Sequence, residues 1–277
     1  MLRQRILTAL VLLALLIPAL VVKAVWPFAL LTLAAMAAAG WEWGRLNQAG
    51  VFAVPLGAAL GLACALALWA GWGEAAPPAA WWLATGAWVL GGTWVLRGGV
   101  SAWPRLPRPV RLGIGFVALW TAWLALANAK ADGLNFILSI FCLVWSADIC
   151  AYAGGRALGR RKLAPGISPG KSWEGVWSGM LGALIVAAAW LVFDASGVAD
   201  SMSFYRIVAT RFSFAGLALV VIFLVAMSVV GDLFESLVKR SAGAKDSSGL
   251  LPGHGGILDR VDALLPVFPI ALALAAR

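Results

Sequence analysis

The chain has 277 residues, of which 62% are hydrophobic and only 12% are charged. An ordinary soluble domain carries about 25% charged residues, and the mean hydropathy here is +0.92. A water-soluble fold of this length could not bury so much apolar surface in a single core. The same composition excludes a disordered chain, a collagen and a disulfide scaffold. It predicts an all-α integral membrane protein.

Candidate membrane spans follow from the apolar runs, because a bilayer core of about 30 Å needs roughly 20 helical residues. Nine such runs occur along the chain. The uncharged part of the ninth run, 263–276, is too short to span, so we expect its helix to begin near Ile257 and to include Asp259, Arg260 and Asp262. The nine expected spans are 6–22, 24–41, 51–73, 76–96, 112–129, 133–155, 175–193, 212–235 and 257–276.

The distribution of basic residues indicates how these spans are oriented. The chain contains 21 Lys and Arg against 12 Asp and Glu, a net charge of +9. With a cytoplasmic N-terminus, sixteen of the 21 basic residues fall on cytoplasmic segments, in agreement with the positive-inside rule. We therefore expect about nine transmembrane helices in a bacterial inner (cytoplasmic) membrane, with the C-terminus on the opposite side. The excess of basic residues is then explained by their collection on cytoplasmic loops, or by contact with anionic lipid or nucleotide phosphates. No nucleic-acid partner is expected.

The chain is predicted to comprise two regions. Residues 1–130 form an N-terminal transmembrane region of about five spans, and residues 131–277 form a catalytic region of about four spans with two polar cytoplasmic segments. The three cysteines lie in apolar runs without a CxxC pair, which indicates core residues and not a redox or zinc site. Several Trp residues stand near expected span ends, where an interfacial belt is typical; they are Trp26, Trp41, Trp43, Trp72, Trp103 and Trp173.

The polar residues of the second region gather in two segments, 148–175 and 231–262. Asp148 lies inside an apolar run, where an ionised carboxylate costs roughly 2.5–3.5 kcal/mol, so it should face the bundle interior or water. Tyr152 and Gly155 follow on the same helical face. A functional carboxylate is favoured here, and an Asp–Arg pair that packs two helices is the alternative. The two segments hold seven of the twelve acids, namely Asp148, Glu174, Asp232, Glu235, Asp246, Asp259 and Asp262.

The stretch GISPGKSWEG in the first segment invites comparison with a P-loop. The spacing excludes that motif, because Gly166 and Gly170 are separated by three residues where a Walker motif has four. The stretch still suits an anion, since Ser168, Lys171 and Ser172 offer donors just before an expected helix N-terminus. The alternative is that Lys171 simply lies among lipid headgroups.

The second segment is richer in polar residues. If the eighth helix continues through residue 239, Asp232, Glu235, Ser236 and Lys239 lie on one face. A Gly-rich loop with the only histidine follows, and Asp259 and Asp262 then open the ninth helix. Carboxylates from two helix ends are a normal way to hold Mg²⁺, whereas zinc would need partners that are absent. The alternatives are a solvated helix end and simple dipole partners.

The stretch SLVKRSAGAKDSSGLLPGHGGILDRVD, residues 236–262, resembles the signature of the phosphatidate cytidylyltransferase (CDP-diacylglycerol synthase) family. The pattern is Ser, Lys-Arg, Lys-Asp, Pro-x-His-Gly-Gly and Asp-Arg-x-Asp at the expected spacing. Asp148-x-x-x-Tyr152 and the stretch 167–175 resemble the same family. The resemblance implies that CTP and phosphatidate give CDP-diacylglycerol and pyrophosphate by direct phosphate attack on the CTP α-phosphate. It also implies Mg²⁺, with K⁺ as a candidate second cation, and suggests a homodimer.

The resemblance implies a role for each polar position. Asp232 and Asp259 are expected to hold the metal, with Asp148, Asp246 and Asp262 as supporting carboxylates. CTP should arrive from the cytosol and phosphatidate sideways from the inner leaflet. Contacts to their phosphates are expected from Lys171, Lys239, Arg240, Lys245 and Arg260, with donors from Ser168 and the turn His254-Gly255-Gly256; further substrate contacts are expected from Tyr152, Ser172, Glu174 and Ser236.

Two alternative functions can be compared with this interpretation. A secondary transporter usually has charges near the midplane of broken helices in related repeats, whereas no repeat occurs here and the polar residues gather at cytoplasmic ends. Another CTP-using lipid enzyme, such as a polyprenol kinase or a synthase of archaeal ether lipids, is disfavoured by the full match from Lys245-Asp246 to Asp259-Arg260-x-Asp262.

Overall fold

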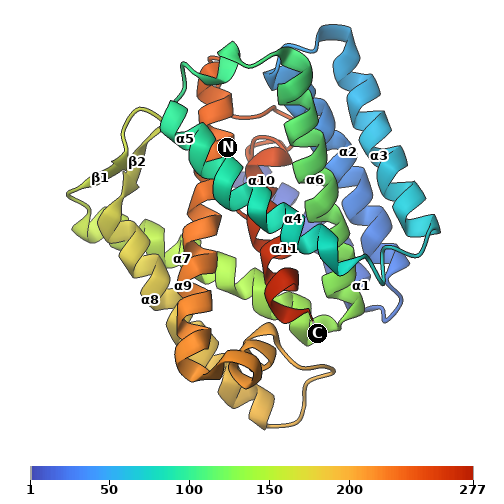
Figure 1. The fold of residues 1–277 in the computed structure, drawn as a ribbon, viewed down its shortest axis with the longest axis vertical. Coiled ribbons are helices and arrows are strands. Elements are labelled where there is room, and N and C mark those ends of the chain that lie inside the picture. The colour runs from blue at the N-terminus through green and yellow to red at the C-terminus, as the bar shows by residue number, and fades with distance from the viewer. Residues whose placement is uncertain (1, 277) are drawn as a thin grey trace.

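The protein is a helical bundle in the computed structural model, which describes residues 2–276, with side chains from residue 6 onward (Figure 1). The described residues form eleven α-helices and one small sheet. The helices are α1 (Leu2–Val21), α2 (Trp26–Leu46), α3 (Ala53–Trp69), α4 (Pro78–Gly86), α5 (Thr93–Gly98), α6 (Arg108–Ala131), α7 (Leu134–Leu158), α8 (Trp173–Ala195), α9 (Phe204–Ser241), α10 (Leu258–Val261) and α11 (Leu264–Ala275).

Each of the nine expected spans overlaps a helix of the structure. The fourth span corresponds to α4 and α5, which the π-helical segment Ala87–Gly92 joins into one continuous helix. Within the described part of the chain, five helices are long and apolar enough to cross a membrane by length and composition. These five are Gly50–Trp69, Arg108–Ala131, Leu134–Leu158, Trp173–Ala195 and Phe204–Ser241.

The expectation of an all-α protein was wrong at one place. Strands β1 (Lys162–Ala164) and β2 (Ser168–Ser172) form an antiparallel hairpin in the loop between α7 and α8. Lys162 lies opposite Ser172 and Ala164 opposite Ser168, with an irregularity between the two pairs. The strands are too short and too exposed to show a hydrophobic alternation, which is the signal that identifies a strand in sequence.

Helix α9 is longer than the span predicted from its apolar residues. It begins at Phe204, where the Ser203 hydroxyl accepts a hydrogen bond from the Arg206 backbone N–H. Ser213 has a non-helical backbone with φ of 67° and marks a kink close to the start of the predicted span. Beyond the kink, the helix continues without interruption to Ser241. The condition under which Asp232, Glu235, Ser236 and Lys239 share one face, a helix that continues through residue 239, is therefore met.

Helix α11 is the central element of the bundle and packs against α4, α6, α7 and α9. Figure 1 shows it between α6 and α9, and residues 264–273 are all buried. The chain is helical from Ile257 as expected, because Ile257, Asp262 and Ala263 all have helical backbone angles, and α10 and α11 are divided only by a gap in helical hydrogen bonding at Asp262 and Ala263. Pro266 contributes to this gap, since proline has no N–H to donate to the Asp262 carbonyl four residues earlier.

An aromatic cluster joins the two halves of the chain. Phe234 of α9 stacks on Trp43 of α2 with ring centroids 5.8 Å apart, and the rings of Trp88 and Trp103 meet Phe234 edge-on. Trp43 and Trp103 are buried and therefore do not belong to the expected interfacial belt, whereas Trp26 and Trp173 are exposed. The last two turns of α9 are thus packed against the N-terminal region.

Candidate active site

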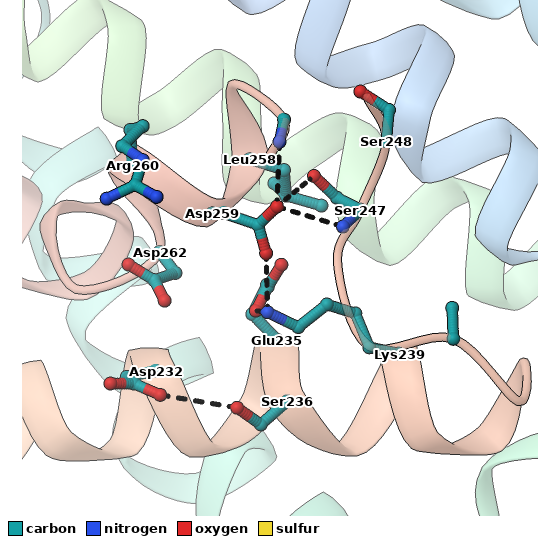
Figure 2. A network of polar contacts seen from close by, with 12 residues as sticks. Asp232, Glu235, Ser236, Lys239, Ser247, Ser248, Leu258, Asp259, Arg260 and Asp262 are labelled. Atoms are coloured by element: carbon teal, nitrogen blue, oxygen red, sulfur yellow. Dashed lines mark hydrogen bonds and ion pairs between the residues drawn. The ribbon is translucent and has the colours of Figure 1, made fainter. Parts of the chain in front are cut away.

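Lys239 lies at the centre of a buried charge cluster near the end of α9. Its ammonium Nζ is 2.5 Å from Oδ1 of Asp259, and it also forms an ion pair with Glu235 one turn earlier on the same helix. The side chains of Lys239, Glu235 and Asp259 are only 12%, 1% and 8% exposed. The predicted face of α9 therefore exists, and it meets the segment that carries Asp259 (Figure 2).

Asp259 is held rigidly by donors from the preceding loop. Its Oδ2 accepts hydrogen bonds from the Ser247 backbone N–H at 2.9 Å, the Ser247 hydroxyl at 2.9 Å and the Gly256 N–H at 2.8 Å. The orientation of this carboxylate is therefore fixed by four contacts, which come from Lys239, Ser247 and Gly256.

Asp262 and Asp232 form a second acidic pair beside this cluster. Asp232 itself is neutralised by Lys171, whose Nζ lies 2.6 Å from Oδ2, and its Oδ1 accepts from the Ser236 hydroxyl at 3.3 Å. Figure 2 shows Asp262 between Asp259 and Asp232. Gly231 permits this arrangement, because a Cβ there would collide with the Asp262 carbonyl.

A cavity of about 530 Å³ adjoins the Lys171–Asp232 pair. Helices α7, α8 and α9 and strand β2 form its walls. Its polar lining includes Asp148, Tyr152, Ser168, Lys171 and Asp232, whereas Val176, Val225 and Val229 line it with apolar surface. The two polar segments of the sequence therefore meet at one cavity. Asp148, Tyr152 and Gly155 all line it, as their helical spacing predicts.

Ser172 and Glu174, two predicted substrate contacts, have local structural partners. The Ser172 hydroxyl caps α8 by accepting from the Gly175 N–H at 3.2 Å. Glu174 accepts from the backbone N–H groups of Arg160 and Arg161 at 3.1 Å and from the Arg161 Nε at 3.0 Å. These contacts fix the hairpin against the start of α8, and thereby place Lys171 at the cavity.

Several predicted residues lie at the edge of the charge cluster. Arg240 donates to the Ala244 carbonyl at 3.3 Å, and Arg260 donates to the His254 carbonyl. Both are exposed, as are Lys245 and Asp246 in the loop that follows α9. The buried Nδ1 of His254 has no hydrogen-bond partner among the described residues. Gly255, with φ of 83°, and Gly256 pass directly beside Asp259 and Glu42.

The sequence analysis missed Glu42, Ser247 and Ser248. Glu42 is fully buried on α2 and accepts hydrogen bonds from both serines. The sequence did contain a sign of Glu42, because a carboxylate inside an apolar helix is a functional candidate by default. Like Asp148, Glu42 is an acid within an apolar run, but it lies far in sequence from the two polar segments.

The residues at this site have the right chemistry for a magnesium ion. Mg²⁺ prefers oxygen ligands and usually combines one or two carboxylates with phosphate oxygens. Asp232, Asp259 and Asp262 supply such oxygens, and the lysines beside them show that the cluster accommodates positive charge. Among the described residues, no three His, Cys, Asp or Glu side chains are close enough to form a complete metal site. Bound phosphates would therefore have to complete the ligand set.

A strongly apolar helical protein with two acids and a lysine around one cavity, and a buried cluster of acids with a second lysine, has the features of a membrane enzyme that acts on phosphates. Comparison with known proteins identifies which kind. The chain matches the cytidylyltransferase family over residues 3–276 and belongs to that family, so it is a nucleotidyltransferase. The resemblance inferred from residues 236–262 is confirmed.

Relatives in several bacteria support this assignment. A phosphatidate cytidylyltransferase from Pseudomonas aeruginosa is 39% identical over 291 residues, which cover 99% of this chain and 97% of its own length. The protein of the same name from Haemophilus influenzae is 46% identical over 137 residues, or 50% of this chain and 44% of that protein. The one from Brucella suis is 44% identical over 145 residues, or 51% of this chain and 48% of that protein.

Proposed function

We propose that this enzyme transfers CMP from CTP to phosphatidate, giving CDP-diacylglycerol and pyrophosphate. The cavity that joins the two polar segments is the observation that carries the proposal. Its lining combines Lys171 and the acids Asp148 and Asp232 with the apolar side chains of Val176, Val225 and Val229. Such a cavity suits a molecule with an anionic phosphate and apolar chains. The names of the bacterial relatives support the same reaction.

The reaction needs charge compensation more than proton transfer. An oxygen of the phosphatidate phosphate attacks the α-phosphorus of CTP, and the bond from that phosphorus to the bridging oxygen of pyrophosphate breaks. The attacking phosphate is already anionic at neutral pH, so it needs little help from a base. The obstacle is the repulsion between two anions, which fixed positive charges overcome by positioning and electrostatic stabilisation.

The lysines of the site would supply part of this charge. Lys171 and Lys239 are held by Asp232 and Asp259, so each ammonium already occupies a fixed position beside the cavity or the acidic cluster. Asp232 and Asp259 would hold Mg²⁺, with Asp148, Asp246 and Asp262 in support, and a K⁺ ion could accompany it. When bound, Mg²⁺ neutralises phosphate charge and stabilises the departing pyrophosphate. Asp232 and Asp259 would hold the metal in place of their present lysine partners, Lys171 and Lys239.

Contacts at both ends of the bundle support the proposed topology, in which the N-terminus and the active site face the cytoplasm. The Thr8 hydroxyl of α1 donates to the Pro252 carbonyl at 3.1 Å, so the start of α1 lies beside the loop of the site. Arg211 near the other end of α9 donates to the carbonyl of Leu274 at the end of α11. The two chain ends thus lie at opposite ends of the bundle. We further propose that phosphatidate enters from the inner leaflet of a bacterial inner membrane and that the enzyme is a homodimer. Cross-linking in native membranes tests the dimer.

The experiment compares wild-type enzyme with Asp232→Asn and Asp262→Asn in detergent micelles containing CTP, phosphatidate and Mg²⁺. Wild type should form a CDP-lipid with one pyrophosphate for each, and both variants should lose about 100-fold or more in kcat. Asp200→Asn is the matched control, because Asp200 lies at the far end of α7 and caps that helix. Normal turnover in Asp232→Asn would contradict the site assignment.

A further inference from the structure

Glu42 is a buried carboxylate on α2, far from the polar segments in sequence. It is 0% exposed, and no lysine or arginine forms an ion pair with it among the described side chains. A buried acid without a cation must obtain its stabilisation from hydrogen bonds. The donors it uses show what the side chain does.

Four donor groups from one loop surround the Glu42 carboxylate, and one of them, the Ser247 hydroxyl, is shared with Asp259. Oε1 accepts from the Ser248 hydroxyl at 2.5 Å and the Ile257 N–H at 3.0 Å. Oε2 accepts from the Leu258 N–H at 2.7 Å and the Ser247 hydroxyl at 3.1 Å. Two donors stand at the beginning of the 247–258 loop and two at its end, so Glu42 holds both ends of the loop together.

The same loop holds Asp259. Ser247 contacts both acids, since its hydroxyl lies 3.1 Å from Glu42 Oε2 and 2.9 Å from Asp259 Oδ2 (Figure 2 shows the Asp259 side of this contact). A hydroxyl has one proton and can donate to only one of them at a time. Gly256, whose N–H donates to Asp259, has no room for a side chain, because a Cβ would collide with Ser247 Oγ and Glu42 Oε1. The carboxylates therefore lie on two sides of one tightly packed loop.

We propose that Glu42 is a positioning residue, which fixes the 247–258 loop and thereby the orientation of Asp259. The expected effect on catalysis rests on the proposed function, whereas the contacts between Glu42 and the 247–258 loop do not depend on it. The role requires a carboxylate, because both of its oxygens accept hydrogen bonds and neither carries a proton that would face the serine hydroxyls or the backbone N–H groups. A glutamine of the same size would turn its NH₂ group toward two of the four donors. The loop would then lose half of its attachment to α2.

The experiment compares Glu42→Gln with wild type and with Glu74→Gln, a control that removes the same charge from an exposed loop position. Hydrogen exchange measures protection of the Ile257 and Leu258 amides, and kinetics measure kcat and KM for CTP. Glu42→Gln should speed exchange at both amides and lower kcat by about 10–100-fold, the usual effect of losing a residue that orients a ligand. KM for CTP should change far less, and Glu74→Gln should match wild type.

Ser248→Ala keeps the proposal testable if Glu42→Gln fails to fold. It removes one donor and leaves the buried acid in place, so we expect a smaller increase in exchange and a smaller loss of kcat. In the Glu42→Gln background it should add little, because the two changes disrupt one contact. Unchanged exchange at Ile257 and Leu258, or a kcat equal to wild type, would overturn the proposal. A wild-type enzyme that forms no CDP-lipid would instead overturn the proposed function, while the exchange measurement still tests Glu42.

Discussion

Replacing Lys239 by methionine should destabilise the protein, because it leaves two buried acids without their cation. Lys239 is the ion-pair partner of both Glu235 and Asp259, whose side chains are 1% and 8% exposed. Methionine has nearly the same length and is apolar, so the change removes the charge and keeps most of the packing. The effect therefore reports on electrostatics more than on lost volume.

The magnitude follows from the burial of the three groups. Removing one partner of a buried ion pair costs about 3–5 kcal/mol, because an uncompensated charge remains in the interior. A loss of 1 kcal/mol lowers the midpoint of thermal unfolding by about 2–4 °C in a chain of this size. We therefore expect Lys239→Met to lower the apparent midpoint in detergent by about 10 °C.

Thermal unfolding of purified protein, followed by tryptophan fluorescence, measures this effect. Lys162→Met is the matched control, since Lys162 is exposed on β1 and its replacement should shift the midpoint by no more than about 2 °C. The double variant Glu235→Gln, Lys239→Met should recover part of the loss, because one of the two unpaired acids is then neutral. A single variant as stable as the control, or a double variant with no recovery, would refute the reasoning.

Two further predictions concern the loop and the far end of α7. Gly256→Ala should lower both stability and turnover because its methyl group collides with Ser247 and Glu42, whereas Gly249→Ala, with open space around it, should resemble wild type in thermal and kinetic assays. Asp200 accepts hydrogen bonds from the backbone N–H groups of Leu134 and Asn135. Burial alone would raise the pKa of Asp200, but these hydrogen bonds lower it below the ordinary value of 3.8. Asp200→Asn should therefore cost about 1 kcal/mol at neutral pH. Because the folded pKa is depressed, the difference should vanish as the pH falls through that pKa, and a difference independent of pH would contradict the assignment.

The positions of the helices could be predicted because apolar runs are long and their ends carry charge. The shared face of Asp148, Tyr152 and Gly155 followed from helical periodicity alone. The gathering of acids in two segments also indicated one site. The Lys171–Asp232 ion pair joins those segments in the structure.

Other features depend on contacts that no local pattern records. The hairpin of β1 and β2 is too short to show a periodicity. Glu42 was overlooked because its donors lie more than 200 residues later in the chain. Trp43 and Trp103 were assigned to the interface from their positions near span ends, but packing around Phe234 buries both.

The most direct test of the central claim follows radiolabelled CTP with purified enzyme, Mg²⁺ and either phosphatidate, diacylglycerol or no added lipid. The account predicts a labelled CDP-lipid and an equal amount of pyrophosphate only with phosphatidate, because the attacking group is a lipid phosphate. Label recovered in no lipid product, or a product formed equally well from diacylglycerol, would contradict it.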